Sequence, residues 1–362
     1  MGATSGHQRE RSTRPARSEA GGSGDSSQPP AGGRRRSPPS RWVLRGGLAL
    51  LLVLALSGAL VYRELDGNIT SVDVDGWLSS DRPPENPSEA LNILLLGSDS
   101  RAGANGEYGD VAGRRSDTAM VVHLAEGRRK AAVVSIPRDT LVDRPECPGQ
   151  DQEAIPPARD VMFNSAYARG GLVCTVATVE KLGDLRLDHA VAVDFAGFEK
   201  LVDTLGGVRI TLSEPIEDPY AGLDLPAGTQ RLTGEQALGL VRTRHGVGNG
   251  SDLARIELQQ KFLKALLRQV DRTGLLTDPV RLHRVLDTAT SSLTTDEELA
   301  SLGALLSLTR SLRGISPERV DFRTLPVTAS STRPNRLVPK KSEAEELWEA
   351  LREDTALPPK NR

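Results

Sequence analysis

The sequence has few of the residues on which metal and redox enzymes depend. It contains two cysteines and five histidines in 362 residues, and neither type is spaced as in a zinc site. A glycine-rich phosphate loop with its lysine is also absent. The net charge of −2 gives no global basic field, which argues against nucleic acid as a partner. Basic residues must therefore act locally, where they cluster.

Large apolar side chains are scarce in residues 1–45, which hold nine arginines, three acidic residues and no lysine. Such a segment cannot bury enough surface to offset its ordering entropy, so we expect it to be disordered. Residues 46–62 follow without a single charge, and with their flanks they are just long enough to cross a membrane as one helix. The preceding arginines favour a cytoplasmic N-terminus and an extracellular main domain. A cleavable signal peptide is the alternative, and it too would export the domain.

The two cysteines, Cys147 and Cys174, both lie in the part of the chain that we expect to be exported. In an oxidising compartment such a pair more often forms a disulfide than two free thiols. The bridge would close a loop of about 27 residues and stabilise the fold by about 3 kcal/mol in the chain-entropy model. A catalytic cysteine is the alternative, but neither residue lies in a recognisable nucleophile motif.

Apolar runs alternate with helical patterns after residue 90, which is typical of an α/β fold. We expect a stalk over residues 63–90, a folded domain over 91–330 and a C-terminal tail over 331–362, with a short helix at 341–352. Residues 141–163 are rich in proline and charge and are expected to form a loop. Strands are predicted at 91–97, 118–124, 130–136, 189–195, 208–212 and 319–325, and helices at 173–185, 195–207, 233–244, 251–270, 278–288 and 296–312. The first three strands are expected to share one sheet.

Charged residues gather at the ends of these apolar runs. Asp252, Arg255 and Gln259 begin the long helix at spacings that place them on one face. If the sheet brings the strand ends together, several carboxylates face several guanidinium groups. The residues at the other ends are Asp99, Arg101, Arg115, Asp117, Arg138, Asp139, Arg242 and Arg244.

This combination of side chains suits a pyrophosphate. Carboxylate oxygens hold Mg²⁺, which keeps part of its coordination shell for phosphate oxygens, and arginine forks pair with the remaining phosphate charge. Neutralising the charge that moves to a leaving phosphate is most of what a protein can contribute to phosphoryl transfer. The alternative is that each residue is a solvated or ion-paired surface charge, which is the default for any single one.

The motifs that contain these residues resemble the LytR-CpsA-Psr family of membrane-anchored cell-wall ligases. The resemblance covers about residues 91–270 and includes a single membrane helix followed by an outside domain. The matching stretches include "NILLLGSDSR", "RRSDTAMVVHL", "KAAVVSIPRDTLVD", "FNSAYARGG", "PAGTQRLTGEQALGLVRTRH" and "DLARIELQQKFLKAL". One departure from the family pattern is that Met162 and Phe163 stand directly before Asn164, where relatives usually have a basic residue close by.

The resemblance implies a mixed sheet flanked by helices on both faces, with a hydrophobic tunnel for a polyprenyl chain. It also implies transfer of a glycopolymer from a polyprenyl-pyrophosphate carrier to peptidoglycan through a phosphodiester, with membrane lipid as a further partner. Asp99 and Asp117 would bind Mg²⁺, and one of them would accept the proton. The pyrophosphate would be held by Arg101, Arg115, Arg138, Arg242 and Arg244, with support from Asp139, Asn164, Asp252, Arg255 and Gln259.

Two other functions are compatible with the same sequence. A polyprenyl-pyrophosphate phosphatase would use the same site with water as the acceptor. A membrane-anchored envelope binder or transcriptional attenuator would need no catalysis, and it would tolerate changes to the aspartates and arginines. The sequence does not identify the glycopolymer, because different polymers share the same lipid carrier.

Overall fold

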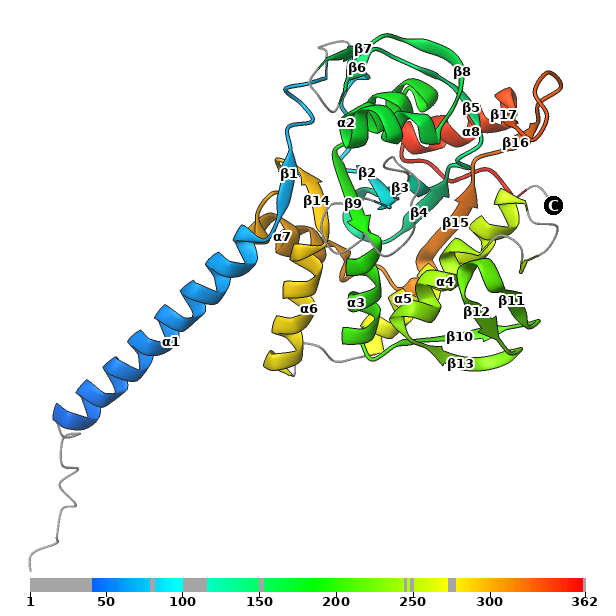
Figure 1. Ribbon diagram of the computed structural model, residues 1–362. Helices are drawn as coiled ribbons and strands as arrows, with labels where there is room; N and C mark the ends of the chain where they lie inside the picture. The colour runs from blue at the N-terminus through cyan, green and yellow to red at the C-terminus, as the bar shows by residue number, and fades with distance from the viewer. Residues whose placement is uncertain are drawn as a thin grey trace, which may run out of the picture. The chain divides into compact units, whose positions relative to one another are not determined.

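A mixed β-sheet forms the centre of the fold (Figure 1). The computed structural model describes residues 41–78, 82–99, 116–149, 153–243, 246–247, 251–272 and 278–360. The chain divides into two units, Met1–Ala55 and Leu56–Arg362, and the sheet belongs to the second. Within the described ranges the sheet has seven strands, in the order Thr70–Val72 (β1), Leu293–Asp296 (β14), His189–Asp194 (β9), Leu91–Ser98 (β2), Ser116–Leu124 (β3), Ala131–Ser135 (β4) and Val320–Thr324 (β15).

The three central strands pair as the apolar runs predict. β2 is antiparallel to β3, and β3 is antiparallel to β4. β9 and β15 are added in parallel to β2 and β4 respectively. The mixed α/β class is therefore confirmed, and strand pairing brings segments far apart in the sequence to the same edge of the sheet.

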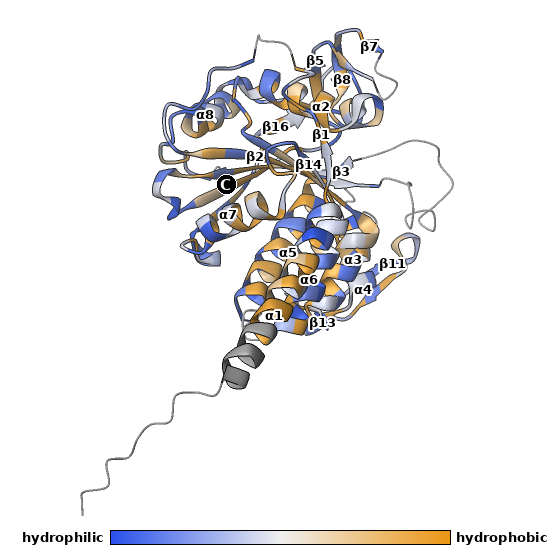
Figure 2. Cartoon of the chain, turned by 90° about the vertical axis from the view of Figure 1, so that its left-hand side faces the viewer, coloured by the Kyte–Doolittle hydropathy of each residue, from blue (hydrophilic) through white to orange (hydrophobic). Residues whose placement is uncertain are grey.

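One face of the sheet is closely packed against two helices, α2 (Asn164–Gly183) and α8 (Lys341–Arg352), which lie on the same side in Figure 2. Leu94, Val121 and Val134 of the sheet are completely buried there. Apolar burial on this scale contributes about 1.5–3 kcal/mol for each large side chain. This layer is therefore the main core of the domain.

The opposite face lies against α3 (Phe195–Thr204), α5 (Asp252–Arg272), α6 (Pro279–Ser291) and α7 (Leu302–Leu312) (Figure 2). Ile93, Leu124 and Ala131 are buried in this layer, and partly buried side chains, among them Val122, Val191 and Leu308, pack against them. The buried core on this face is thus smaller than the core on the α2 side.

A second apolar core lies beside the sheet. It joins α3 and α5 to α4 (Gly234–Arg242) and to two short ribbons, β10 (Val208–Leu212) with β13 (Gly228–Leu232), and β11 (Ile216–Asp218) with β12 (Leu223–Leu225). α4 begins at a capping box, in which Thr233 and Gln236 each bond the other's backbone N–H. This core fixes α4 against α5, and so fixes the end of α4 that carries Arg242.

Cys147 and Cys174 form the predicted disulfide. It links β6 (Cys147–Pro148) to the middle of α2, which is kinked at Gly170 and Gly171. Residues 141–163 do not form the expected loop. They form two ribbons, Leu141–Arg144 (β5) with Ala158–Met162 (β8), and β6 with Ala154–Ile155 (β7). Two-residue strands held by a disulfide leave no periodic signal in a sequence.

Residues 63–90 are not simply a stalk. α1 (Arg41–Gly67) continues into them, β1 joins the edge of the sheet, and Val74 is buried in the main core. Apolar side chains such as Leu51 and Leu54 on α1 are 65 % and 59 % exposed. Among the described residues, no helix combines the length and the apolar character needed to span a bilayer, so the membrane span stays a prediction.

Residues 331–362 are not simply a tail either. They contain β17 (Leu337–Pro339), which pairs with β16 (Val327–Ala329), and they contain α8 at the bounds predicted from the sequence. Trp348 of α8 is 1 % exposed and lies in the main core. A Cβ atom on Gly183 would lie 2.8 Å from the Trp348 ring, so this glycine allows α8 to pack closely on α2.

Replacing Trp348 with alanine should lower the free energy of unfolding by about 3–5 kcal/mol, because a large core cavity would remain. Urea titration of the purified chain, followed by circular dichroism, measures the change. Tyr220→Ala is the control, since Tyr220 is 88 % exposed and its loss should change stability by about 0.5 kcal/mol or less. A Trp348→Ala effect as small as that of the control would show that α8 is not part of the core.

Candidate pyrophosphate site

Three strands place charged residues at one edge of the sheet. β2 ends at Ser98 and is followed by Asp99, β3 begins at Ser116 and continues with Asp117, and β4 is followed by Arg138. Because β3 runs antiparallel to both neighbours, its beginning lies beside the ends of β2 and β4. Segments separated by up to 40 residues of sequence are therefore neighbours in space.

A register shift turns Asp117 out of the regular ladder. Gly97 pairs with Thr118 and Ser98 pairs with Ser116, so Asp117 is the extra residue between two successive pairs. Such bulges redirect a side chain and are frequent next to functional sites. The Tyr167 hydroxyl donates a hydrogen bond of 2.7 Å to Ser98 Oγ and so holds the end of β2 from the α2 side.

Arg138 lies among three carboxylates. Its guanidinium donates to Asp117 and lies 3.5 Å from Asp252 Oδ1 and 3.7 Å from Asp139 Oδ2, measured from Nε. Its backbone N–H donates to Asp252 Oδ2 at 3.1 Å. The Arg138 carbonyl accepts a hydrogen bond of 3.1 Å from the backbone N–H of Asn164, the first residue of α2. Both the main chain and the side chain of Arg138 are thereby fixed.

The first turns of α5 support this arrangement from the other layer. Arg255 pairs with Asp252 and donates from Nη2 to the Asp117 carbonyl at 3.1 Å. Gln259 donates from Nε2 to Thr118 Oγ1 and to the Val241 carbonyl, both at 2.9 Å. The three residues of the helix face predicted by their spacing thus contact β3 and the last turn of α4.

Burial shifts the pKa values of the two residues that form the ion pair at the start of α5. Desolvation raises the pKa of Asp252, against the opposing effects of Arg255 and Arg138. Desolvation likewise lowers the pKa of Arg255, although Asp252 counteracts it. The Arg255 side chain is 1 % exposed. The two charges therefore compensate each other, because an unpaired charge at this depth would be strongly destabilising.

Arg242 reaches the same edge from α4. Its guanidinium carbon lies 5.1 Å from the centre of the Phe195 ring, which is a cation–π geometry. Phe195 begins α3 directly after β9. A Cβ atom on Gly97 would lie 3.2 Å from Thr118 Cβ and 3.9 Å from the Phe195 ring. A glycine at position 97 thus leaves room for the close approach of β2, β3 and α3.

Several expected residues lie outside the part of the chain that the structure describes, namely Arg101, Arg115 and Arg244. The structure brings together Asp117, Arg138, Asp139, Asp252, Arg255 and Gln259, with Asn164 in contact through its backbone. Asp99 and Arg242 lie at the same edge. Sequence reasoning missed Phe195 and Tyr167. The only signals for them were an aromatic residue at a strand-to-helix junction and the tyrosine in "NSAYA".

The carboxylates of Asp99 and Asp117 are a donor set that fits Mg²⁺. Asp99 directly follows β2 and Asp117 lies in the adjacent strand β3, next to the Ser98–Ser116 pair. In the described residues no three His, Cys, Asp or Glu side chains converge as a metal site. Mg²⁺ is commonly held by one or two carboxylates together with substrate phosphates, so the pair fits an ion that is shared with a phosphate substrate.

The sequence of this chain is similar to those of known proteins. The model of the LytR_cpsA_psr family matches residues 61–353. The chain is 32% identical over 266 residues to the cell wall biosynthesis protein LcpA of Corynebacterium glutamicum, covering 66% of this chain and 50% of LcpA. It is 32% identical over 289 residues to the polyisoprenyl-teichoic acid–peptidoglycan teichoic acid transferase TagT of Bacillus subtilis, covering 76% of this chain and 84% of TagT. The chain therefore spans about half the length of the corynebacterial relative and most of TagT.

Solved structures share the fold. An enzyme from Actinomyces oris described as LytR-Csp2A-Psr superimposes with a TM-score of 0.58 at 22% identity, covering 78% of this chain and 95% of that chain. TagT bound to LI-WTA superimposes with a TM-score of 0.56 at 24% identity, covering 78% of this chain and 98% of that chain. At this level of identity the likeness supports the mixed α/β architecture.

Replacing Arg255 with methionine should destabilise the chain by about 3–5 kcal/mol, because Asp252 would be left buried without this partner. The double variant Arg255→Met, Asp252→Asn should recover part of the loss, since the uncompensated charge is removed. Urea unfolding of the wild type, both single variants and the double variant gives the coupling energy. Strictly additive effects of the two substitutions would contradict this account.

Proposed function

Because the chain belongs to the LytR-CpsA-Psr family, we propose that it transfers a glycopolymer from a polyprenyl-pyrophosphate carrier to peptidoglycan through a phosphodiester. The observation that carries this proposal is the ion pair of Arg138 with Asp117 at the edge of the sheet where Asp99 and Arg242 also lie. Guanidinium groups pair with phosphate oxygens, and carboxylates hold the counter-ion that a pyrophosphate needs. The teichoic acid transferase name of TagT supports the same class of reaction.

The lipid portion of the carrier has a suitable surface on one face of the sheet. Val122 and Val191 on this face are apolar and only partly buried. Gln259 connects β3 to α4, because it bonds both Thr118 at the start of β3 and the last turn of α4. We propose that the polyprenyl chain lies against this face, with its pyrophosphate at the sheet edge.

In the proposed reaction, a muramic acid hydroxyl attacks the phosphorus next to the glycan sugar. The new P–O bond joins glycan and peptidoglycan, the bridging P–O bond of the pyrophosphate breaks, and polyprenyl phosphate leaves. Asp99 or Asp117 accepts the hydroxyl proton, while Arg138 and Arg242 hold the phosphates and stabilise the developing charge. Mg²⁺ bound by the two aspartates would neutralise further phosphate charge. Asp139 and Asp252 keep Arg138 in place.

The proposal includes anchoring to the membrane. Residues 46–62 carry no charge, and α1 extends through them. The arginines before this segment favour a cytoplasmic N-terminus, which would place the domain outside the cell, where its peptidoglycan acceptor lies. The disulfide fits an oxidising, extracellular location.

Replacing Arg242 with alanine should lower transfer by about 10²–10³-fold, because a guanidinium aimed at the phosphate is lost. Lysine at this position should recover part of the activity, as a single ammonium cannot pair in two places. The assay follows lipid-linked glycopolymer into a conjugate with peptidoglycan, and free phosphate is measured in parallel. Arg209→Ala is the control, since Arg209 is exposed on β10.

Full transfer by folded Arg242→Ala protein would overturn the assigned role of Arg242. Release of free phosphate by the wild type, without any conjugate, would instead indicate a polyprenyl-pyrophosphate phosphatase. Unfolding of the variant is checked by circular dichroism, so that a lost fold is not taken for a lost phosphate contact.

Removing divalent ions with a chelator should stop transfer, and added Mg²⁺ should restore it, because the paired carboxylates would otherwise repel the phosphates. Asp117→Asn should raise the Mg²⁺ concentration needed for half-maximal rate by removing one charged ligand. Transfer rates are measured over a series of Mg²⁺ concentrations for both proteins. Unchanged turnover in the chelator would contradict the magnesium role.

A further inference from the structure

A cavity of about 770 Å³ lies on the α2 side of the sheet, away from the charged site. α2 begins at Asn164 beside Arg138, whereas the α2 residues that line the cavity start at Ala177. The two points are thirteen residues apart along α2, with the kink at Gly170 and Gly171 between them. The other walls come from Trp77, Leu78, Arg82, Pro83 and Pro84 and from the ribbon at Cys147. The volume is in the range of small-molecule sites.

An exposed tryptophan stands at this cavity. The chain has three tryptophans; Trp348 is buried in the core, whereas Trp77 lines the cavity and is 44 % exposed. Tryptophan is enriched among the residues that contribute most to binding at interfaces. In a chain with so few aromatic residues, this position for an indole points to a ligand.

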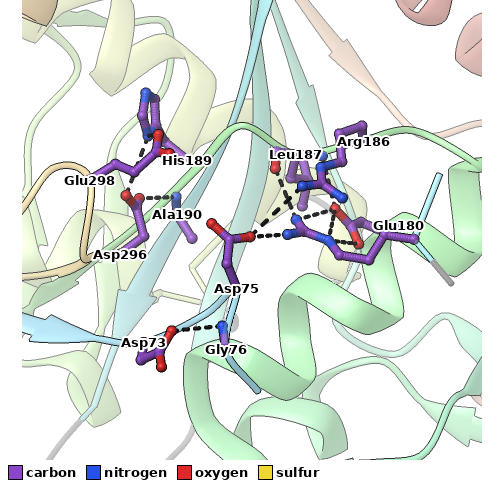
Figure 3. Close-up of polar contacts among 11 residues, drawn as sticks. Asp73, Asp75, Gly76, Glu180, Arg186, Leu187, His189, Ala190, Asp296 and Glu298 are labelled. Carbon is purple, nitrogen blue, oxygen red and sulfur yellow. Dashed lines mark hydrogen bonds and ion pairs between the residues drawn. The ribbon is translucent and has the colours of Figure 1, made fainter. Parts of the chain in front are cut away.

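The segment that carries Trp77 is held firmly. Val74 is 5 % exposed in the core, the Gly76 N–H donates to Asp73 Oδ1 at 2.7 Å, and the Leu78 N–H donates to the Val74 carbonyl at 3.1 Å. Figure 3 shows the Asp73–Gly76 contact. The indole is thus presented by a closed turn, so little ordering entropy would be lost when a ligand binds.

An ion pair fixes the other end of the same wall. Arg82 donates from Nη2 to Glu180 Oε1 at 2.7 Å and from Nε to Oε2 at 2.9 Å, and it also donates to the Leu187 carbonyl at 3.1 Å. The Leu187 N–H donates to Glu180 Oε1 at 3.0 Å (Figure 3). The exposed fractions of these side chains are 8% for Arg82 and 4% for Glu180. Their bonds are made within the protein, so this pair builds the wall.

The other charged side chains that line the cavity are both acidic and basic. Glu146, Lys181 and Asp184 line it and are exposed. Together they carry a net charge of −1, which does not suit a phosphate-rich polymer. An indole face with carboxylates and an amine around it suits a sugar, whose ring has apolar C–H faces and whose hydroxyls and amides donate and accept hydrogen bonds.

We propose that this cavity binds an uncharged segment of a glycan chain, and that Trp77 stacks on a sugar ring there. The inference rests on the proposed function, in which the acceptor is a polymer that extends far beyond the reacting hydroxyl. A contact remote from the site adds affinity for a long glycan through effective concentration, without touching the reacting atoms.

The probe is the uncharged tetramer of β-1,4-linked N-acetylglucosamine, titrated into the full-length chain in detergent. Calorimetry and tryptophan fluorescence both report binding. The wild type should bind the tetramer saturably, and Trp77→Ala should raise Kd by about tenfold or more, as expected for loss of a central aromatic contact. Trp77→Phe should retain part of the affinity. Tyr220→Ala is the matched control, because Tyr220 is another exposed aromatic, 88 % exposed and outside the cavity lining, and it should bind as the wild type does.

Three outcomes would overturn the inference. The first is that the wild type shows no saturable binding at millimolar tetramer, and the second is that folded Trp77→Ala protein binds the tetramer equally well. The third outcome is displacement of the tetramer by a polyol phosphate polymer at the same concentration. Arg242→Ala separates this inference from the proposed function, because it should lose transfer and still bind the tetramer. If the wild type transfers nothing but binds the tetramer through Trp77, the proposed function fails and the glycan site stands.

Discussion

The structure depends on the ion pairs that hold Arg138 among Asp117, Asp139 and Asp252. Like-charged carboxylates repel unless a cation lies between them, so the guanidinium is what allows three acidic residues to share one edge. Arg255 compensates the most buried of them, Asp252. A phosphate entering this site would compete with the aspartates for the guanidinium, and a cation on the released aspartates would relieve their repulsion. Arginine and metal thus act as one electrostatic unit in the proposed reaction.

The two faces of the sheet have different roles. Against α2 and α8 the side chains are completely buried, as Leu94 and Val121 show, and this layer supplies the stability of the domain. Against α7 the apolar side chains of Val122 and Val191 are only partly covered. An incompletely packed layer gives up dispersion contacts, so it lowers stability unless a ligand completes it. A lipid chain that filled this layer would stabilise the fold and at the same time bring its pyrophosphate to Arg138.

Much of this was accessible from the sequence, because it depends on local patterns. The apolar runs located β2, β3 and β4, and the spacing of Asp252, Arg255 and Gln259 located the inward face of α5. What was missed depends on tertiary structure. β1 has three residues, Trp348 lies in a helix rich in lysine and glutamate, and Phe195 meets Arg242 only because β9 lies beside β2. Neither the periodicity nor the composition of the sequence predicts any of these contacts.

α2 links the two binding regions inferred from the structure. Its first residue bonds the Arg138 carbonyl, its middle is tied by the Cys147–Cys174 disulfide to a ribbon, and its far end lines the cavity beside Trp77. The disulfide attaches to α2 just after its kink at Gly170 and Gly171. The same ribbon forms part of the cavity wall, since Cys147 lines it. One covalent link therefore fixes the spacing between the reacting end and the proposed glycan contact, which is what a long polymer bound at both points requires.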